Sequence, residues 1–469
     1  MKLYNTLSRS IEEITPHVKG ALTMYSCGPT VYDYTHIGHL RTYINTDILK
    51  RTLQAEGNKV THVMNITDVG HLAGDDGDDT GEDKMEKGVK KYGKTIDEIV
   101  TSFTDFFMHS LIKANINMPD RLPKATDHIG DMIALNKVLQ EKGHTYETEE
   151  GLYFDTSTFK AYGALSGQKL EDKQQMREDV HADPNKKQPA DFALWLKRVG
   201  RFKDHTLHWE SPWGDGFPGW HIECSAMSMK YLGETIDIHT GGIDHIPVHH
   251  ENEIAQSEAA TGKKFVNHWF HCEFLMIEGQ KMSKSLGNLL TIEDIEKKGI
   301  EPAALRLLFL QTHYRQEMNF TWDALQASQN ALKRLREAVQ QTKSQTQRSQ
   351  LSTEKAETTS ALSQKFYDAL SQDLQTPQAV AIVWEILKSN IPSEDKYDLI
   401  IECDRILGLG LDKGVSHIIN EIPENVQKLV EARNIARKEK NYEESDRLRV
   451  EIEKEGYIVL DTSGGTVLK

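Results

Sequence analysis

Residues 21–66 predict a strand, a tight turn, a helix and a second strand in direct succession. ALTMYSC is a short apolar run suited to a buried strand, and Gly28 and Pro29 end it. Apolar residues at helical spacing then continue to Gly57, and NKVTHVMNIT follows as the next strand. Such a βαβ unit has its ligand site where the first strand ends and the helix begins. The stretch CGPTVYDYTHIGH (27–39) lies at that point.

Two histidines at the expected start of this helix suit a phosphate ligand. Helix N-termini attract phosphate, because their first N–H groups have no partner inside the helix. His36 and His39 are three positions apart, so their imidazoles share one face and can donate hydrogen bonds to phosphoryl oxygens. Gly38 between them lets the backbone approach a ligand closely. The alternative for an isolated HxGH is a pair of surface histidines beside a turn.

Chain-wide properties narrow the setting. A chain of 469 residues exceeds what one core fills and predicts two to four domains. Its net charge of −15 excludes a general polycation, so any nucleic acid must be bound by local patches. Four widely spaced cysteines indicate reduced thiols or metal ligands, not a disulfide framework. With no apolar signal core and no apolar run near ~18 residues, we expect a cytoplasmic protein without membrane contact.

A second phosphate-binding signal lies far downstream, in IEGQKMSKSLGN (277–288). Lys281 and Lys284 would place two mobile ammonium groups beside small residues, which suits a triphosphate. HIGH at 36–39 and KMSKS at 281–285 together resemble the two signatures of class I aminoacyl-tRNA synthetases, and both match at every position.

A candidate metal site comes from a third set of residues. Cys224 lies in PGWHIECSAM, and HHENEIAQSE places His249 and Glu253 four residues apart on one helix face. Joined by Cys27, they supply the N, O and S donors that a tetrahedral zinc accepts. Taken singly, a cysteine at a strand end is usually a small buried hydrophobe, and a His/Glu pair is common on solvated helices. HEN at 250–252 does not begin HExxH, so a metalloprotease is excluded.

These residues make the chain resemble the cysteinyl-tRNA synthetase family nearly end to end. The matching segments include YNTL, CGPTVYDYTHIGHLRT, NITD, SPWG, PGWHIECSAM, DIHTGG, HHENEIAQSE, KMSKSLGN, LRLLFLQTHYR and ARKEKNYEESDRLR. The resemblance implies an α/β fold: a Rossmann-type parallel-sheet catalytic domain with an inserted connective segment, then an α-helical bundle and a small C-terminal anticodon-binding domain. The expected segments are catalytic first half 1–115, connective insertion 116–205, catalytic second half 206–270, KMSKS-bearing stem-contact region 271–322, helical bundle 323–412 and anticodon-binding domain 413–469.

The resemblance also implies an activity, which is ATP-dependent attachment of L-cysteine to tRNA(Cys) through a cysteinyl-adenylate. Magnesium would accompany ATP, and one zinc per chain would select the substrate thiol over the serine hydroxyl. The implied site residues are, for catalysis, His36, His39, Lys281 and Lys284; for ATP, His36, Gly38, His39, Asp244 and Lys284; for the amino acid, Thr67 and Trp220; for zinc, Cys27, Cys224, His249 and Glu253; and for tRNA, Tyr442, Asp446 and Asp461. The family further implies a monomer.

Two other functions stay open from the sequence. A cysteine ligase acting on an amino sugar, as in mycothiol synthesis, would share the zinc and nucleotide residues, but such relatives lack the full anticodon-binding end that this chain has. An inactive tRNA-binding paralogue would have no chemical reason to keep both motifs and all four ligands. Two polar stretches are expected to be loops: residues 68–86, with eight carboxylates, and residues 339–360.

Overall fold

The computed structural model describes residues 1–70, 84–167, 183–282, 287–343, 351–413, 424–439, 441–455, 459–462 and 465–468. The chain divides into two compact units, residues 1–415 and residues 416–469. Within the described ranges, no helix is both long and apolar enough to cross a membrane.

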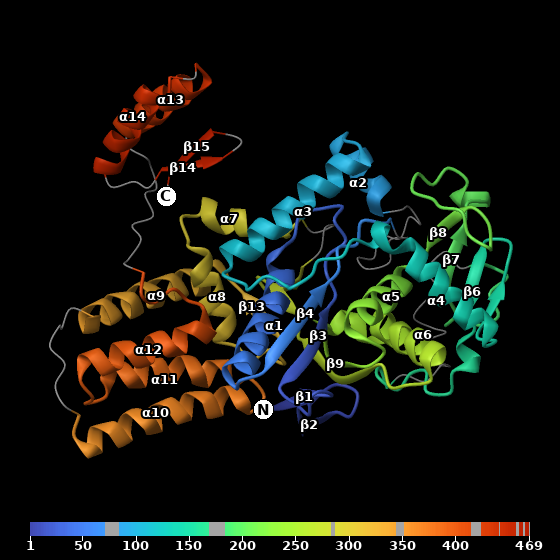
Figure 1. Ribbon diagram of the computed structural model, residues 1–469, viewed down its shortest axis with the longest axis horizontal. Coiled ribbons are helices and arrows are strands. Elements are labelled where there is room, and N and C mark those ends of the chain that lie inside the picture. The colour runs from blue at the N-terminus through green and yellow to red at the C-terminus, as the bar shows by residue number, and fades with distance from the viewer. Residues whose placement is uncertain are drawn as a thin grey trace. The chain divides into compact units, whose positions relative to one another are not determined.

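A four-stranded parallel sheet forms the centre of the larger unit (Figure 1). Its order is β10-β9-β3-β4, and each neighbouring pair is parallel. The strands are β3 (Ala21–Ser26), β4 (Lys59–Met64), β9 (Ile236–Gly242) and β10 (Val266–Cys272). Ser26 pairs with Met64 on one side and with Thr240 on the other, so the residue that follows β3 lies at the carboxyl edge of the sheet.

Helix α1 (Ile37–Ala55) joins β3 to β4, which confirms the predicted βαβ unit. His36 is its N-cap, and Gly57, at φ 89°, follows its last turn. The residues at the predicted helical spacing are all buried: Leu40, Tyr43, Ile44, Ile48, Leu49 and Leu53. These side chains anchor α1 on the sheet, and the helix therefore presents its N-terminus at the carboxyl edge of the sheet.

An antiparallel sheet is inserted between β4 and β9. Its order is β5-β6-β7-β8, and its strands are β5 (Thr145–Glu147), β6 (Gly151–Phe154), β7 (Phe192–Lys197) and β8 (Gly216–Pro218). The helices of this stretch and its flanks are α2 (Lys84–Tyr92), α3 (Ile96–Lys113), α4 (Ile129–Glu141), α5 (Trp220–Leu232) and, after β9, α6 (Glu251–Thr261).

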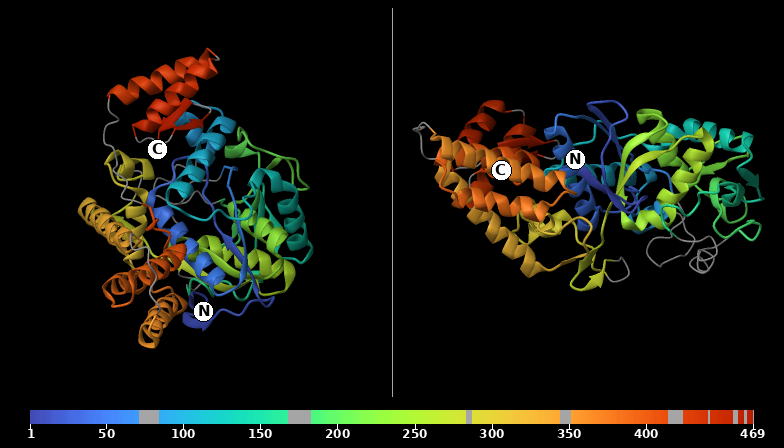
Figure 2. Two further views of the ribbon diagram at one scale, coloured as in Figure 1. Left: turned by 60° about the vertical axis from the view of Figure 1, so that its left-hand side comes forward. Right: turned by 90° about the horizontal axis from the view of Figure 1, so that it is seen from below.

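A small three-stranded sheet follows β10 and leads into a helical bundle. The sheet has the order β12-β11-β13 and consists of β11 (Leu275–Ile277), β12 (Gln280–Lys281) and β13 (Met318–Phe320). The helices are α7 (Ile292–Lys297), α8 (Pro302–Leu310), α9 (Trp322–Lys343), α10 (Thr353–Ser371), α11 (Thr376–Lys388) and α12 (Ser393–Leu407). The bundle α9–α12 and the sheet β5–β8 lie on opposite sides of the parallel sheet (Figure 2).

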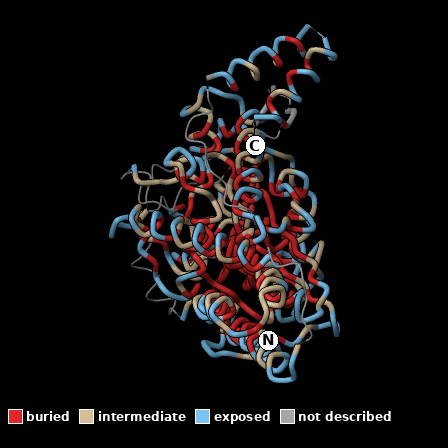
Figure 3. The backbone as a smooth tube through the Cα atoms, turned by 90° about the vertical axis from the view of Figure 1, so that its left-hand side faces the viewer, coloured by how far each residue is buried: buried red, intermediate tan, exposed pale blue. Residues whose placement is uncertain are grey.

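Buried residues gather around the parallel sheet and along the inner faces of the bundle helices (Figure 3). At the N-terminus, β1 (Lys2–Asn5) pairs with β2 (Ser10–Glu13). The smaller unit contains α13 (Glu424–Lys438), α14 (Tyr442–Lys454) and the hairpin β14 (Val459–Thr462) and β15 (Gly465–Leu468). It has a core of its own, formed by Val426, Ile452 and Val459.

The polar stretch 339–360 is more helical than its composition predicts. Helix α9 continues to Lys343, and α10 begins at Thr353 with Ser352 as its N-cap. The reason is that Gln, Lys, Glu and Ala are good helix formers even where few apolar side chains mark a buried face. Residues 71–83, which hold most of the other predicted polar loop, lie outside the described residues.

Candidate functional site

The turn after β3 places Cys27 at the carboxyl edge of the parallel sheet. The N–H of Gly28 donates to Oδ1 of Asn65 at 2.8 Å, so the residue after β4 anchors the residue after β3. A Cβ at position 28 would lie 1.6 Å from the carbonyl oxygen of Asn65, and glycine is therefore required there. The Cys27 thiol is buried beneath this turn.

The structure brings all four predicted metal ligands together. The donor atoms of Cys27, Cys224, His249 and Glu253 all lie within 4.8 Å of one another, and the four side chains are buried. Cys224 comes from α5, and Glu253 from α6. His249 lies in the π-helical turn η6 (Ile246–His250) that leads into α6, and its Nε2 is 3.0 Å from Oε1 of Glu253. One π turn within a helix is a common feature of functional sites.

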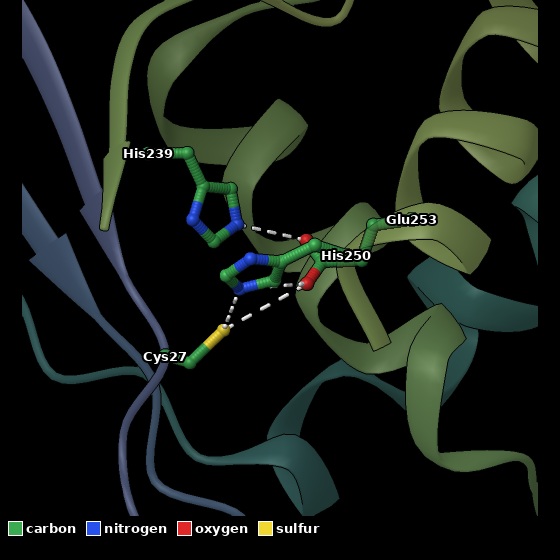
Figure 4. Close-up of side chains that lie close together, drawn as sticks. All are labelled: Cys27, His239, His250 and Glu253. Atoms are coloured by element: carbon green, nitrogen blue, oxygen red, sulfur yellow. Dashed lines mark hydrogen bonds and ion pairs between the residues drawn. The ribbon is translucent and has the colours of Figure 1, made fainter. Parts of the chain in front are cut away.

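A second group of four shares two of these residues (Figure 4). Cys27 and Glu253 also lie within 4.8 Å of ring nitrogens of His239 and His250. Nε2 of His239 is 2.9 Å from Oε2 of Glu253, and Nε2 of His250 is 3.3 Å from Sγ of Cys27. On the other side of its ring, Nδ1 of His250 forms a hydrogen bond of 2.7 Å with Nε2 of His271. Of the other two predicted ligands, Cys224 contacts the amide of Asn65 and His249 contacts the imidazole of His221, so each side chain of the set has a neighbouring imidazole or amide.

Electrostatics in this buried cluster favour charge on three side chains: a thiolate, a carboxylate and an imidazolium, the last of which must lose its proton before it can bind a metal. Burial raises the pKa of Cys224, but its contacts with Cys27 and His249 bring that pKa down to about 7. Burial opposes charge on Glu253 as well, yet His239 and His249 lower its pKa to about 2. In the same way Glu253 and Cys224 raise the pKa of His249 to about 10 against the effect of burial. A thiolate and a carboxylate are therefore available near neutral pH.

The chemistry of this donor set fits zinc. Two cysteine sulfurs, one imidazole nitrogen and one carboxylate oxygen from separate elements are the donors that zinc accepts in proteins. Soft thiolates select against magnesium and calcium, which prefer oxygen donors. The structure thus contains a buried Cys/His/Glu cluster compatible with a metal ion.

The two histidines of HIGH stack at the start of α1. Their ring centroids are 3.6 Å apart with an interplanar angle of 24°, so both imidazoles share one face as expected. Nδ1 of His36 accepts a hydrogen bond of 3.3 Å from the backbone N–H of His39 and so caps the helix. A Cβ at Gly38 would lie 3.1 Å from Cε of Met282, so the KMSKS segment packs against HIGH at this point.

The other residues predicted to bind nucleotide are placed only in part. Lys281 lies exposed in β12, with its Nζ 5.8 Å from the ring centroid of Phe274. Lys284 lies among residues 283–286, outside the described part of the chain. Asp244 follows β9 and is exposed; a Cβ at Gly242 would lie 2.2 Å from its Oδ1, so glycine leaves room for this carboxylate.

Thr67 and Trp220, the predicted amino-acid residues, lie beside the metal cluster. Oγ1 of Thr67 donates to Oε2 of Glu223 at 2.9 Å and accepts from Nδ2 of Asn65 at 2.9 Å. The Trp220 ring lies 4.5 Å from the His249 ring. Thr67 is buried, and its hydroxyl is engaged by Glu223 and Asn65.

Sequence reasoning did not single out several residues around the cluster. These are Asn65, Glu223, His239, His250 and His271, which hold the predicted residues in place. Asn65 and His271 lie at strand ends and Glu223 and His250 lie beside predicted ligands, which was a usable signal; His239 lies in the middle of β9 and gave none. Which ring reaches which ligand depended on the packing of four elements.

The predicted tRNA residues belong to the smaller unit. Tyr442 begins α14 and is 64% exposed, and Asp446 is exposed one turn later. Asp461 lies in β14, and its side chain lies outside the described part of the chain.

Comparison with solved structures shows what fold this chain shares. The fold resembles that of Mycobacterium tuberculosis methionyl-tRNA synthetase in complex with methionyl-adenylate, with a TM-score of 0.55 and 14% sequence identity over 88% of this chain and 94% of the other. A sequence identity this low establishes a shared fold and nothing about function. The parallel sheet with HIGH at the start of α1 and KMSKS after β11 has the architecture of a class I aminoacyl-tRNA synthetase.

The sequence comparisons identify the family within that class. The family model for the class I (C) tRNA synthetase catalytic domain matches residues 13–330, and the cysteinyl-tRNA ligase anticodon-binding domain matches residues 420–466. Cysteine–tRNA ligase of Treponema denticola is 44% identical, covering 100% of this chain and 99% of its own. Cysteine–tRNA ligase 1 of Burkholderia lata is 41% identical, covering 99% and 96%. The chain belongs to the cysteinyl-tRNA synthetase family.

Proposed function

We propose that this chain attaches L-cysteine to tRNA(Cys) in two steps, through a cysteinyl-adenylate formed from ATP. The observation that carries the proposal is the convergence of Cys27, Cys224, His249 and Glu253 at the sheet edge from which the HIGH helix also starts. Full-length similarity to cysteine–tRNA ligases supports the same activity.

Zinc is the metal that we propose for the buried cluster, held by Cys27, Cys224, His249 and Glu253. The chemistry that a bound zinc supplies is preference for a thiolate over a hydroxyl, and cysteine differs from serine by that one group. Trp220 lies against the His249 ring, and Thr67 hydrogen-bonds Glu223, the residue before Cys224; both are proposed to shape the pocket for the rest of the amino acid.

In the first step the cysteine carboxylate attacks the α-phosphorus of ATP. A carboxyl oxygen to phosphorus bond forms, the bond to the bridging oxygen breaks, and pyrophosphate leaves with magnesium. His36 and His39, with Gly38 allowing close approach, are proposed to hold the α-phosphate oxygens, while Lys281 and Lys284 follow the leaving phosphates. The adenosine is proposed to lie along the segment of Asp244. This chain contributes positioning and charge, and no covalent enzyme intermediate is required.

In the second step a ribose hydroxyl of the terminal tRNA adenosine takes the cysteinyl group and releases AMP. The smaller unit is proposed to bind the anticodon, since the family model for that domain matches it. Tyr442 offers a ring for base stacking, and Asp446 and Asp461 offer acceptors for base edges. We propose that the protein acts as a cytoplasmic monomer whose domains follow the six predicted segments.

The direct test is transfer of labelled cysteine, with ATP, to total tRNA and in parallel to a glucosaminyl-inositol acceptor, with excess unlabelled serine present. Label on tRNA that resists serine and disappears on zinc chelation supports the proposal. Label on the sugar supports the amino-sugar ligase. Label on neither acceptor, with zinc bound, supports an inactive paralogue.

The proposed monomer is tested by light scattering. A measured mass of twice 53.3 kDa would overturn it.

A further inference from the structure

Arg41 is a buried cation two residues after HIGH, and its partners are carbonyl groups. It is 1% exposed. Its Nη1 donates to the carbonyl oxygens of Glu273 at 2.7 Å and Phe274 at 2.5 Å, and its Nη2 to those of Gln316 at 2.5 Å and His313 at 3.4 Å. Within the described ranges no carboxylate forms an ion pair with it. Burying a guanidinium costs several kcal/mol of desolvation, at an order of magnitude, unless hydrogen bonds offset it. The four carbonyl groups that converge on Arg41 supply those hydrogen bonds.

The four carbonyls belong to the two segments that lead into the KMSKS-bearing sheet. Phe274 immediately precedes β11, and Gln316 lies just before β13. The carbonyl of Phe274 also accepts the backbone N–H of Met318 at 3.2 Å, so Arg41 binds where β11 and β13 are joined. Strand β12, which carries Lys281, pairs with β11. The ring of Phe274 faces the Lys281 ammonium at 5.8 Å.

Two other contacts tie the start of α1 to the KMSKS segment and to the residues that follow it. The backbone N–H of Ile37 donates to the carbonyl of Leu290 at 2.8 Å. Met282 packs so close to Gly38 that an added Cβ would lie 3.1 Å from its Cε. The histidines of HIGH and the lysine strand are therefore held relative to each other before and after the KMSKS loop.

We propose that Arg41 is a positioning residue for adenylate formation: its fork of four hydrogen bonds fixes the KMSKS-bearing sheet relative to His36 and His39. The inference rests on the proposed function. Arginine is needed because its planar guanidinium presents several donors in a fixed geometry, whereas a lysine ammonium is a point charge on a flexible chain. Arg41 is 1% exposed and offers no surface to a substrate, so it acts through the strand that carries Lys281.

The first test is Arg41→Lys in cysteine-dependent pyrophosphate exchange. Lysine keeps the charge but cannot reproduce the fork. We expect kcat to fall about 10- to 100-fold, since small misplacements of reacting groups cost up to about that much. KM for cysteine should stay within about twofold, and zinc content should equal that of the wild type, because the metal cluster is not touched. Arg41→Gln is the second variant, since a neutral amide is cheaper to bury and folds more readily.

A double-mutant cycle with Lys281→Ala separates positioning from general structural damage. If Arg41 acts through Lys281, the combined variant should be about as slow as the slower single variant.

Arg306→Lys is the matched control. Arg306 is also fully buried beside α1, but its Nη2 pairs with Asp47 at 2.6 Å and its Nε donates to the carbonyl of Leu407 in α12. Its Nη1 donates to the carbonyls of Ala114 and Asn115, so among the described residues none of its hydrogen bonds goes to the KMSKS-bearing sheet. The fold reductions in kcat caused by Arg306→Lys and Lys281→Ala should therefore multiply in the combined variant.

Multiplying effects of Arg41→Lys and Lys281→Ala would overturn the inference. So would an Arg41→Lys enzyme that matches the wild type, or one that changes only KM for cysteine. A wild-type chain without cysteine-dependent exchange would instead overturn the proposed function, so the two failures are distinguishable.

Discussion

Nε2 of His249 lies 3.0 Å from Oε1 of Glu253, one helical turn later, and both side chains are buried against the thiols of Cys27 and Cys224. The carboxylate is the only one in this predicted set of four ligands. Its charge balances the imidazole in the structure and would balance zinc when the metal is bound.

Glu253→Gln should therefore lose the metal. The amide keeps the size of the side chain but is a poor zinc ligand, and we expect zinc affinity to fall at least about 100-fold, since even the neighbours of metal ligands are worth 10- to 100-fold. The measurement is zinc per chain by mass spectrometry after dialysis.

Cys403→Ala is the control for a buried thiol away from the cluster. Cys403 is buried in α12 of the bundle, so its loss should reduce stability slightly and leave zinc content unchanged. Full zinc occupancy in Glu253→Gln, or equal loss in Cys403→Ala, would contradict the assignment.

The two roles of His36 can be separated by two substitutions. His36→Asn keeps an N-cap but removes the imidazole, whereas His36→Ala removes both. Both variants should lower kcat for pyrophosphate exchange about 100-fold, since one donor to developing charge is worth that much. Only His36→Ala should also lose about 1 kcal/mol of unfolding free energy in urea. An active His36→Asn would show that capping is the whole role of this residue.

Tyr442→Ala should weaken the binding of tRNA without changing the rate of adenylate formation. The ring is 64% exposed in the smaller unit, and loss of one stacking contact costs about 1–3 kcal/mol. We expect KM for tRNA to rise at least about fivefold, and cysteine-dependent pyrophosphate exchange to stay at the wild-type rate. Val450→Ala, at another exposed apolar residue of α14, is the control and should change neither value.

His62 should make the fold sensitive to acid. Its ring is buried in β4, with Nε2 2.8 Å from Oγ of Ser26, and burial lowers its pKa from 6.5 to about 3. Between these two values the unfolded chain binds a proton that the folded chain does not. Stability is therefore lost as pH falls below 6.5, by about 1.4 kcal/mol per pH unit from this group.

His62→Gln removes that proton and can still hydrogen-bond Ser26. The free energy of unfolding in urea should be measured from pH 7.5 down to about pH 5. Below pH 6.5 its decline should be less steep in the variant by about 1.4 kcal/mol per pH unit, which corresponds to one proton. Parallel curves for the variant and the wild type would show that folding does not lower the pKa of His62.

The local elements of the catalytic centre could be predicted from the sequence. Strand 21–26, the helix after HIGH and the strand that ends at Met64 follow from apolar runs, a Gly-Pro turn and helical spacing, because these signals act between near neighbours in the chain. The stretch 339–360 shows the limit of this reasoning. Its few apolar residues predicted a loop, but helix propensity extends α9 and α10 into it from both sides.

The sequence by itself determined which residue types were available: two thiols, an i, i+4 His/Glu pair, HIGH and KMSKS. Only the tertiary structure decided that Cys27 and Cys224, far apart in the chain, meet at one edge of a parallel sheet, and that His239 and His250 reach the same carboxylate and thiol. It alone gave Arg41 four carbonyl partners from two later segments. The physical reason is that burial and long-range hydrogen bonds depend on how separate elements pack, and no local pattern encodes that packing.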